Sequence, residues 1–142
     1  MTSKTGETDR NQYKAWFDKY MARTNSSKYG AGTNFTAEDC WNFRCAILHQ
    51  GHSSHIKMQY KRILFIEPPL PNFGIHCCMI GAKSKNKSLL IDLKVFCLDI
   101  ITSANKWLEE NENSDIFKKN YQYLIRRHPK GLAPVQGCPV IG

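Results

Sequence analysis

The organisation of this chain is decided by residues 36–51, which read TAEDCWNFRCAILHQG. Thr36 followed three residues later by Asp39 resembles a capping box, in which each side chain bonds the backbone N–H of the other residue. Gly51 stands where helices commonly end with a left-handed residue. These signals predict a helix from Ala37 to about Gln50. Its apolar residues cover more than a narrow stripe, so we expect it to be buried on more than one side.

Further helices and strands are predicted on both sides of this helix. Apolar residues at helical spacing predict helices over residues 11–22, 93–108 and 116–127, with Asp92 as the cap of the second. Apolar runs bounded by Pro, Gly and polar residues predict strands over 62–67, 75–80 and 88–91. We therefore expect an α+β fold that is mainly helical, with about four helices and a small antiparallel sheet inserted over residues 62–91.

Length and composition favour one folded domain. The chain has 142 residues, of which 42% are apolar and 23% charged, as in globular proteins and unlike disordered or fibrous ones. The polar residues 1–10 are predicted to be disordered, and residues 11–129 to form the domain. Residues 130–142 contain Pro134 and Pro139 and are predicted to form an extended tail.

The charge balance and the chain start bear on partners and compartment. A formal net charge of +8 favours a polyanionic partner. The polar first ten residues lack the apolar region of a signal peptide, and the most apolar segment, 88–101, is too short and too charged to span a bilayer. We expect a cytoplasmic protein without a membrane partner, whose six cysteines are reduced.

Several common catalytic and cofactor motifs are absent from the sequence. It has no phosphate-binding glycine loop, no G-x-S-x-G elbow and no C-x2-C pair, so no cofactor and no metal are predicted. One metal site is kept as an alternative, because three histidines recur at intervals of three residues and imidazole is a common ligand. Its ligands are His49, His52, His55 and, as a fourth, His76.

Arg44 and His49 are the candidate catalytic residues. An arginine within an apolar helix is costly unless it is paired or reaches a cavity. His49 lies on the last turn, where the negative end of the helix dipole favours a proton. At 3.6 residues per turn the two lie about 140° apart, so they converge within one chain only if the last turn loosens. The alternatives are Arg44 ion-paired to Glu38 or Asp39, and His49 as a C-terminal cap.

Arg44-x4-His49, in an apolar helix that ends in Gln-Gly, resembles the R-x4-6-H motif of HEPN domains, the higher eukaryotes and prokaryotes nucleotide-binding domains. Many of these helical domains are metal-independent endoribonucleases of toxin–antitoxin, anti-phage and RNA-processing systems. The resemblance implies a homodimer whose facing motifs form the RNA-cleaving cleft. It implies that Arg44 binds the scissile phosphate and that His49 is the acid–base group. Residues 65–68 and 139–142 also resemble uncharacterised bacterial or phage proteins, a likeness that names no activity.

Clusters of basic residues are candidate contacts for RNA phosphates, with tyrosines nearby that could stack on bases. The residues are Lys57, Lys61, Arg62, Lys83, Lys85, Lys87, Arg126 and Arg127. Taken singly, each cluster is more often a solvated face. Together with the motif, they lead to the hypothesis of an RNA-directed HEPN-like protein, plausible as a metal-independent endoribonuclease of a defence or toxin system. It would act as a homodimer, with an antitoxin or other protein as a possible partner. The alternative is a non-catalytic helical module that binds a protein or a nucleic acid.

Overall fold

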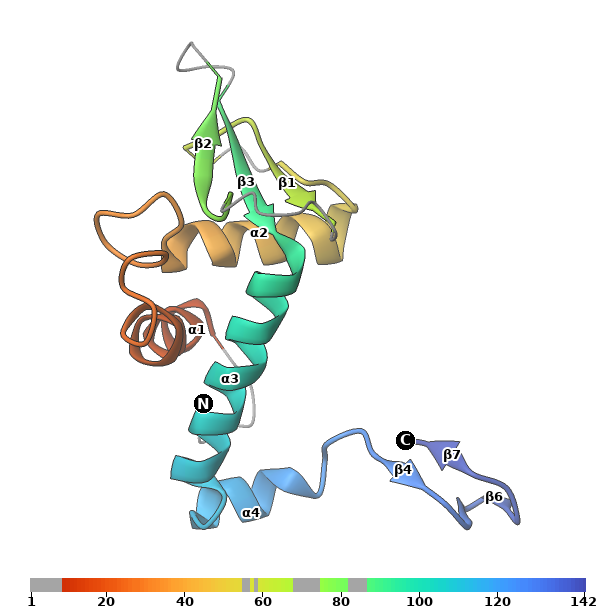
Figure 1. The fold of residues 1–142 in the computed structure, drawn as a ribbon. Coiled ribbons are helices and arrows are strands. Elements are labelled where there is room, and N and C mark those ends of the chain that lie inside the picture. Colours follow the sequence, from red (N-terminus) through yellow and green to blue (C-terminus); the bar gives the residue numbers. More distant parts are fainter. Residues whose placement is uncertain (1–8, 55–56, 58, 68–74, 82–86) are drawn as a thin grey trace. The chain divides into compact units, whose positions relative to one another are not determined.

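The fold class is confirmed by a computed structural model, which describes residues 9–54, 57, 59–67, 75–81 and 87–142. The described residues form helices and short strands in the order expected for a mainly helical α+β protein (Figure 1). The elements are α1 (Arg10–Trp16), η1 (Phe17–Ala22), α2 (Ala37–Gln50), β1 (Arg62–Ile66), β2 (Cys78–Ile80), β3 (Ser88–Asp92), α3 (Leu93–Asn111), α4 (Asp115–Tyr121), β4 (Arg127–His128), β5 (Gly131–Leu132), β6 (Val135–Gln136) and β7 (Val140–Ile141).

The described chain divides into two compact units, residues 9–109 and residues 110–142. The first unit contains α1, η1, α2, the sheet of β1, β2 and β3, and all but the last two residues of α3. The second contains α4 and the four short C-terminal strands. The residues expected to be disordered, 1–10, lie largely outside the described residues, except that Asp9 caps α1 by accepting from Gln12 N at 2.8 Å.

Local sequence signals set both ends of α2. Thr36 and Asp39 form the expected capping box, with Thr36 Oγ1 accepting from Asp39 N at 3.2 Å and Asp39 Oδ2 accepting from Thr36 N at 3.1 Å. Gly51 follows the helix in the left-handed region, with φ +64°. Such caps satisfy backbone groups that a helix end leaves unpaired. The result is a fixed α-helix over the whole candidate motif.

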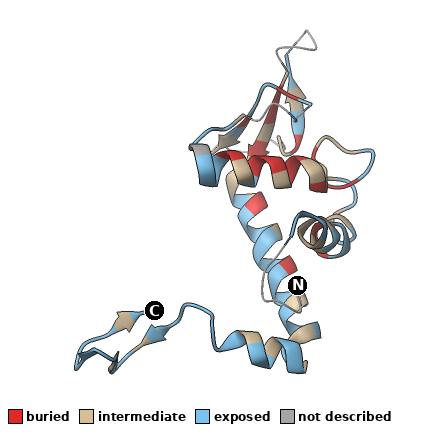
Figure 2. Ribbon diagram, turned by 180° about the vertical axis from the view of Figure 1, so that it is seen from behind, coloured by how far each residue is buried: buried red, intermediate tan, exposed pale blue. Residues whose placement is uncertain are grey.

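The first unit is built around an aromatic core. Phe35 is fully buried and makes edge-to-face contacts with Phe17, Tyr29 and Phe96, at centroid distances of 6.0, 6.1 and 5.9 Å. Figure 2 shows the buried positions concentrated on α2 and the sheet of this unit. The core residues are Phe17, Met21, Tyr29, Phe35, Ala37, Cys40, Phe43, Tyr60, Ile63, Cys77, Leu89, Ile91 and Phe96.

The sheet has the strand order β1-β3-β2 and is mixed. β2 pairs antiparallel with β3, as expected, whereas β1 pairs parallel with β3 from Arg62↔Ser88 to Ile66↔Asp92. A short link joins β2 to β3, which permits only an antiparallel pairing. The longer connection after β1 takes the chain to the far edge of the sheet, so β3 returns between the other two strands in the direction of β1.

α3 begins at the sheet and packs on the first helix. Asp92 Oδ1 accepts from Val95 N at 2.9 Å, which confirms the expected cap. Further along, buried Ser103 donates from Oγ to the Tyr20 carbonyl at 3.1 Å. Tyr20 lies in η1, a π-helix, whose wide turns displace carbonyls from the usual α-helical ladder. This bond joins α3 to the N-terminal helix.

The C-terminal segment departs from the expected helix and extended tail. α4 ends at Tyr121 instead of continuing to Arg127. Arg126 and Gly142 exchange both backbone bonds, at 3.0 and 3.2 Å, and β4 pairs with β7 beyond them. Inside this pair, β5 and β6 form a second antiparallel pair. Residues 126–142, here called the C-terminal hairpin, are thus folded back on themselves, and pairing with the chain end competes with helix extension.

Candidate functional site

Arg44 is an exposed residue of α2. Its guanidinium carbon is 5.3 Å from the centroid of the Trp41 ring, a cation–π contact. The carboxylates that could have paired with it have other partners. Glu38 is bound by Arg10 and by Lys14, and Asp39 belongs to the capping box. Among the described residues Arg44 therefore has no ion pair, and its charge faces solvent.

α2 is buried on more than one side over its first ten residues, as expected. The buried residues cover more than half of the helix circumference and are Ala37, Asp39, Cys40, Asn42, Phe43 and Ala46. The last turn differs, because Leu48 is 62% exposed and Ile47 is exposed as well. Arg44 avoids the cost of burial because its side chain is exposed, close in sequence to these large apolar side chains that the described chain leaves uncovered.

His49 is exposed on the last turn of α2. Its ring makes no hydrogen bond in the described part of the chain. The helix end is closed by backbone bonds instead, in which Gly51 N donates to the Ile47 carbonyl and His52 N to the Ala46 carbonyl. The helix stays regular through Gln50, so the last turn does not loosen. Arg44 and His49 consequently keep the separation of about 140° that an α-helix imposes, and one chain does not bring them together.

Three of the basic residues meet where β1 and β3 begin. Lys61 N donates to the Lys87 carbonyl at 2.8 Å, and Arg62 is the register partner of Ser88. Lys61 and Arg62 are exposed and Lys87 is half-exposed. Hydrogen bonding between the two strands therefore places three positive residues next to one another. We call Lys61, Arg62 and Lys87 the strand-start cluster.

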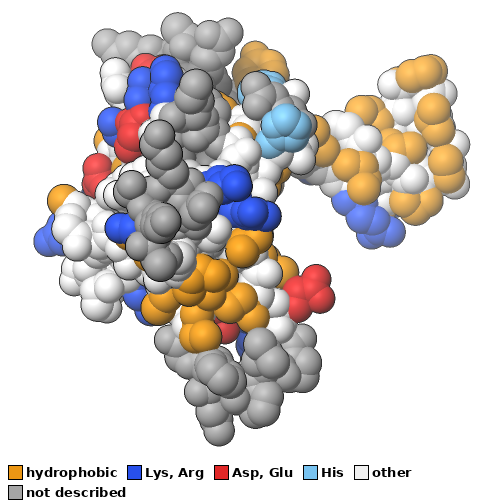
Figure 3. Space-filling view, turned by 90° about the horizontal axis from the view of Figure 1, so that it is seen from above, with side chains coloured by type: hydrophobic (Ala, Val, Ile, Leu, Met, Phe, Trp, Pro, Cys, Tyr) orange, Lys and Arg blue, Asp and Glu red, His pale blue; other side chains and the backbone are white. Residues whose placement is uncertain are grey.

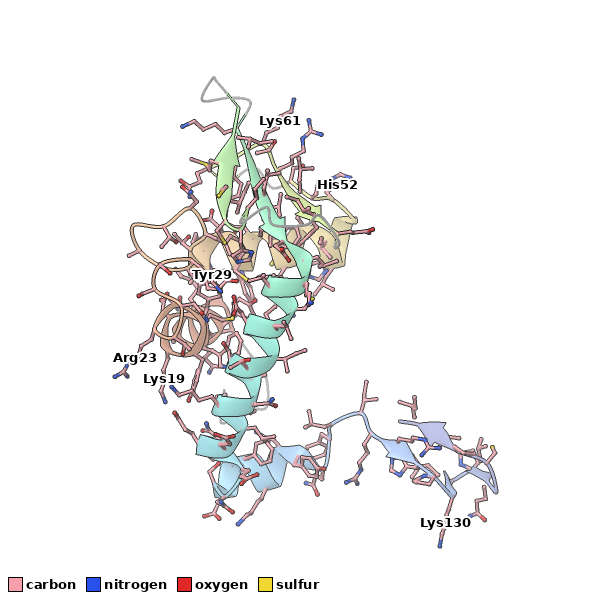
Figure 4. The ribbon with its side chains drawn as sticks, viewed as in Figure 1. Lys19, Arg23, Tyr29, His52, Lys61 and Lys130 are labelled. Atoms are coloured by element: carbon pink, nitrogen blue, oxygen red, sulfur yellow. The ribbon has the colours of Figure 1, made fainter. Side chains whose placement is uncertain are left out.

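The segment that follows α2 runs beside this cluster. Ile63 N donates to the Ser53 carbonyl at 2.8 Å, which holds residues 51–54 against β1. His52 precedes Ser53, and Figure 4 shows His52 and Lys61 as outward-pointing side chains beside β1. The end of α2 that carries His49 is therefore linked by backbone to the basic edge of the sheet.

The remaining predicted RNA contacts divide into three groups. Lys57 is described and exposed, while Lys83 and Lys85 lie outside the described residues. Arg126 and Arg127 belong to the second unit, where the Arg126 guanidinium lies 6.0 Å from the Tyr121 ring centroid. The structure brings together three of the eight predicted contacts and places the two C-terminal arginines in the second unit.

The four-histidine metal alternative finds no support in the described residues, which contain no group of three or more His, Cys, Asp or Glu suited to a metal. His55 lies outside those residues. His76 is engaged elsewhere, because its Nε2 lies 2.7 Å from the hydroxyl of Tyr29.

A polar network around Tyr29 was missed by the sequence reasoning. The Tyr29 hydroxyl donates to Asp99 Oδ2 at 2.9 Å, and Lys28 Nζ donates to the same oxygen at 3.1 Å. Since the hydroxyl has one proton, His76 must donate to Tyr29 from Nε2, which leaves Nδ1 without a proton. Nδ1 is buried and has no partner among the described residues. Burial, and then the charge of Lys28, lower the pKa of His76.

Nothing local in the sequence marks this network, since its members are separated by 47 and 70 residues. Tyr29 lies in a polar loop, and Asp99 follows the pattern of a solvated helix position. Burial raises the pKa of Tyr29 far above its usual value, so the hydroxyl stays protonated. Both ring nitrogens of His76 are turned inward, and the network links the loop before α2 to α3 inside the first unit.

The buried thiols are poor nucleophiles. Desolvation raises the pKa of Cys40 to about 11 and that of Cys77 to about 12. A thiol reacts as its thiolate, so both side chains are inert at neutral pH. All six cysteines are free. Arg44 and His49 remain the exposed pair with side chains suited to acid–base and phosphate chemistry.

No protein-family model, curated protein or solved structure matches the chain. Within the described residues, no helix has both the length and the hydropathy needed to cross a membrane. The resemblance to HEPN domains therefore rests on the residues of α2 and on their surroundings.

Proposed function

We propose that this chain is a HEPN-like, RNA-directed protein of the cytoplasm and a metal-independent endoribonuclease, of the kind found in defence and toxin systems. The observation that carries the proposal is the exposed guanidinium of Arg44, which has no carboxylate partner among the described residues, on the same helix as the exposed imidazole of His49. A buried or ion-paired Arg44 would have argued for a structural role.

The proposed reaction is attack of an RNA 2′-hydroxyl on the adjacent phosphorus. His49 performs one of the two proton transfers, from the 2′-hydroxyl or to the leaving 5′-oxygen, and water performs the other; the products are a 2′,3′-cyclic phosphate and a 5′-hydroxyl. Arg44 stabilises the phosphate oxygens with two parallel N–H donors. Because the two residues point in different directions on one α2, the cleft is completed by the α2 of a second copy.

Two surfaces support this arrangement. The uncovered Ile47 and Leu48 border Arg44, so a second copy meeting this face would cover apolar area. The strand-start cluster lies beside the end of α2 and provides phosphate contacts close to His49. Lys57, Lys83 and Lys85 are proposed as further contacts, whereas Arg126 and Arg127 belong to the second unit and are not needed for the cleft. An antitoxin is proposed to act by covering the α2 face.

The test is cleavage of single-stranded RNA in EDTA by the full chain and its variants. His49→Ala is expected to reduce the rate by about 10²–10⁴-fold, the usual contribution of an acid–base group. Arg44→Ala and Arg44→Lys should both lose activity, because lysine lacks the bidentate geometry. Detection of 2′,3′-cyclic phosphate ends identifies the mechanism.

Matched controls separate chemistry from charge. Arg23→Ala removes an exposed arginine from a loop outside the site, and His52→Ala removes the next histidine along the chain (Figure 4). Both should keep cleaving RNA. Undiminished cleavage by His49→Ala contradicts the proposal, and loss of activity in EDTA and in His52→Ala would favour the metal alternative.

The second candidate is a non-catalytic module that binds a protein or a nucleic acid. The contact of Arg44 with the Trp41 ring favours it, because a stacked guanidinium can be held as a packing group. Salt-sensitive RNA binding without cleavage, unchanged in Arg44→Ala and His49→Ala, would establish this function instead.

A further inference from the structure

The C-terminal hairpin has no interior. Every residue of the second unit is exposed or half-exposed, including its large apolar side chains. Ile125, next to the hairpin, is 79% exposed and Ile141 is 76% exposed, and Leu132 and Val135 are about half exposed. Figure 3 shows apolar side chains over much of the visible surface of β4–β7. An isolated two-stranded hairpin is marginally stable in water, so this segment needs a surface to cover it.

The charge of the segment indicates the chemistry of that surface. Residues 122–142 contain Arg126, Arg127 and Lys130 and no acidic residue. The surface should therefore be apolar with carboxylates at its border, since like charges opposed across a contact are unfavourable.

The chain itself contains such a surface. Cys97, Ile101, Ala104 and Leu108 repeat at intervals of four, three and four residues along α3 and share one side of the helix. All four are exposed, with Ile101 at 55%, whereas Phe96 and Ser103, which are buried, lie on another side. We call these four residues the α3 stripe. Glu109 follows the stripe directly, and Glu110 and Glu112 come next in the chain.

We infer that the C-terminal hairpin of one copy docks on the α3 stripe of a second copy, and that the contact is reciprocal. The apolar side chains of the hairpin then cover the stripe, and its arginines face the carboxylates at the stripe's end. A reciprocal exchange is two-fold symmetric and closes at two copies. RNA is the less suitable occupant, because phosphates would satisfy the arginines and leave Ile125 and Ile141 in water. This inference does not depend on ribonuclease activity.

The test is the mass of the full chain in solution over a range of concentrations. Wild type is expected to be a dimer, and Ile101→Lys to raise the dimer dissociation constant by about tenfold or more, because it places a desolvated charge in an apolar contact. Thr102→Lys is the matched control, an exposed residue of the same helix about 100° away from Ile101. It should stay dimeric. Circular dichroism confirms that both variants keep their helices.

A charge reversal identifies the two surfaces. Arg127→Glu and Glu109→Arg should each weaken the dimer, and the double variant should recover it. A monomeric wild type, or a dimer unaffected by Ile101→Lys, overturns the inference. Loss of the dimer in Leu48→Lys alone places the contact on α2 and overturns it too, while the proposed cleavage cleft survives. If hairpin variants lose affinity for RNA while the mass of the assembly in solution stays the same, the hairpin is an RNA contact and the inferred docking is overturned as well.

Discussion

The hydroxyl of Tyr29 donates a hydrogen bond of 2.9 Å to the carboxylate of Asp99, and it does so from a position that is only 1% exposed. Tyr29, labelled in Figure 4, comes from the loop before α2 and Asp99 from α3. The same hydroxyl lies 2.7 Å from Nε2 of His76. Three segments of the first unit thus meet at one oxygen atom.

Removal of that oxygen should loosen the first unit. Tyr29→Phe leaves Asp99 and His76 without a shared partner and is expected to reduce the free energy of unfolding by about 1–3 kcal/mol. Urea denaturation measures the change. Tyr123→Phe, at an exposed tyrosine of the second unit, should have no effect and serves as the control. Equal stability of Tyr29→Phe and wild type would show that the network contributes nothing.

Stability should fall on mild acidification. Burial and Lys28 lower the pKa of folded His76, against the opposing charges of Asp99 and Asp92, so the unfolded chain binds the proton more readily. The contribution of His76 is therefore complete above the unfolded pKa of about 6.5 and decreases below it, by at most about 1.4 kcal/mol per pH unit. Urea denaturation at a series of pH values measures this slope. His76→Gln should flatten it below about pH 6.5, and an unchanged slope would rule out His76 as its source.

The capping box of α2 should be worth a measurable free energy. Thr36→Ala removes the acceptor for Asp39 N and is expected to lower the free energy of unfolding by about 1 kcal/mol. Thr102→Ala replaces an exposed threonine inside α3 and provides the comparison in thermal or urea denaturation. If the two variants were equally stable, the box would have no net effect.

Salt dependence should identify the strand-start cluster as a phosphate surface. Arg62→Ala is expected to weaken binding of single-stranded RNA and to reduce the slope of log K against log salt by about 0.7, the value for one lost phosphate contact. Fluorescence anisotropy in an otherwise inactive His49→Ala background measures both quantities. Arg23→Ala should leave the slope unchanged, and the same slope in Arg62→Ala would place the RNA elsewhere.

Features that depend on neighbours in the sequence could be predicted, and features that depend on distant pairing could not. The capping box, Gly51 and the Asp92 cap are local, and each is found in the structure. The parallel pairing of β1 with β3 depends on which edge the chain reaches after Ile66, which no local pattern encodes. Likewise, α4 ends early because Arg126 pairs with Gly142, a contact between residues sixteen apart.

The candidate site was predictable in its residues and not in its setting. The sequence indicated Arg44 and His49 as candidate residues, yet the apolar residues around them predicted a helix buried along its whole length. The last turn of α2 keeps Ile47 and Leu48 exposed, and periodicity alone does not distinguish a turn covered within the chain from one left uncovered. The association of Lys61 with Lys87 likewise required the strand pairing.

The bond from Ile63 N to the Ser53 carbonyl has a consequence for assembly. The bond pairs an outward-facing backbone N–H of β1, an edge strand, with the segment that follows α2. That segment is not a strand, so it does not offer a further strand an edge to pair with. Open strand edges are where proteins stack into fibrils, and this contact blunts one of them in the first unit. The cost of adding a strand at this point of β1 is therefore the loss of a bond that the folded chain already makes.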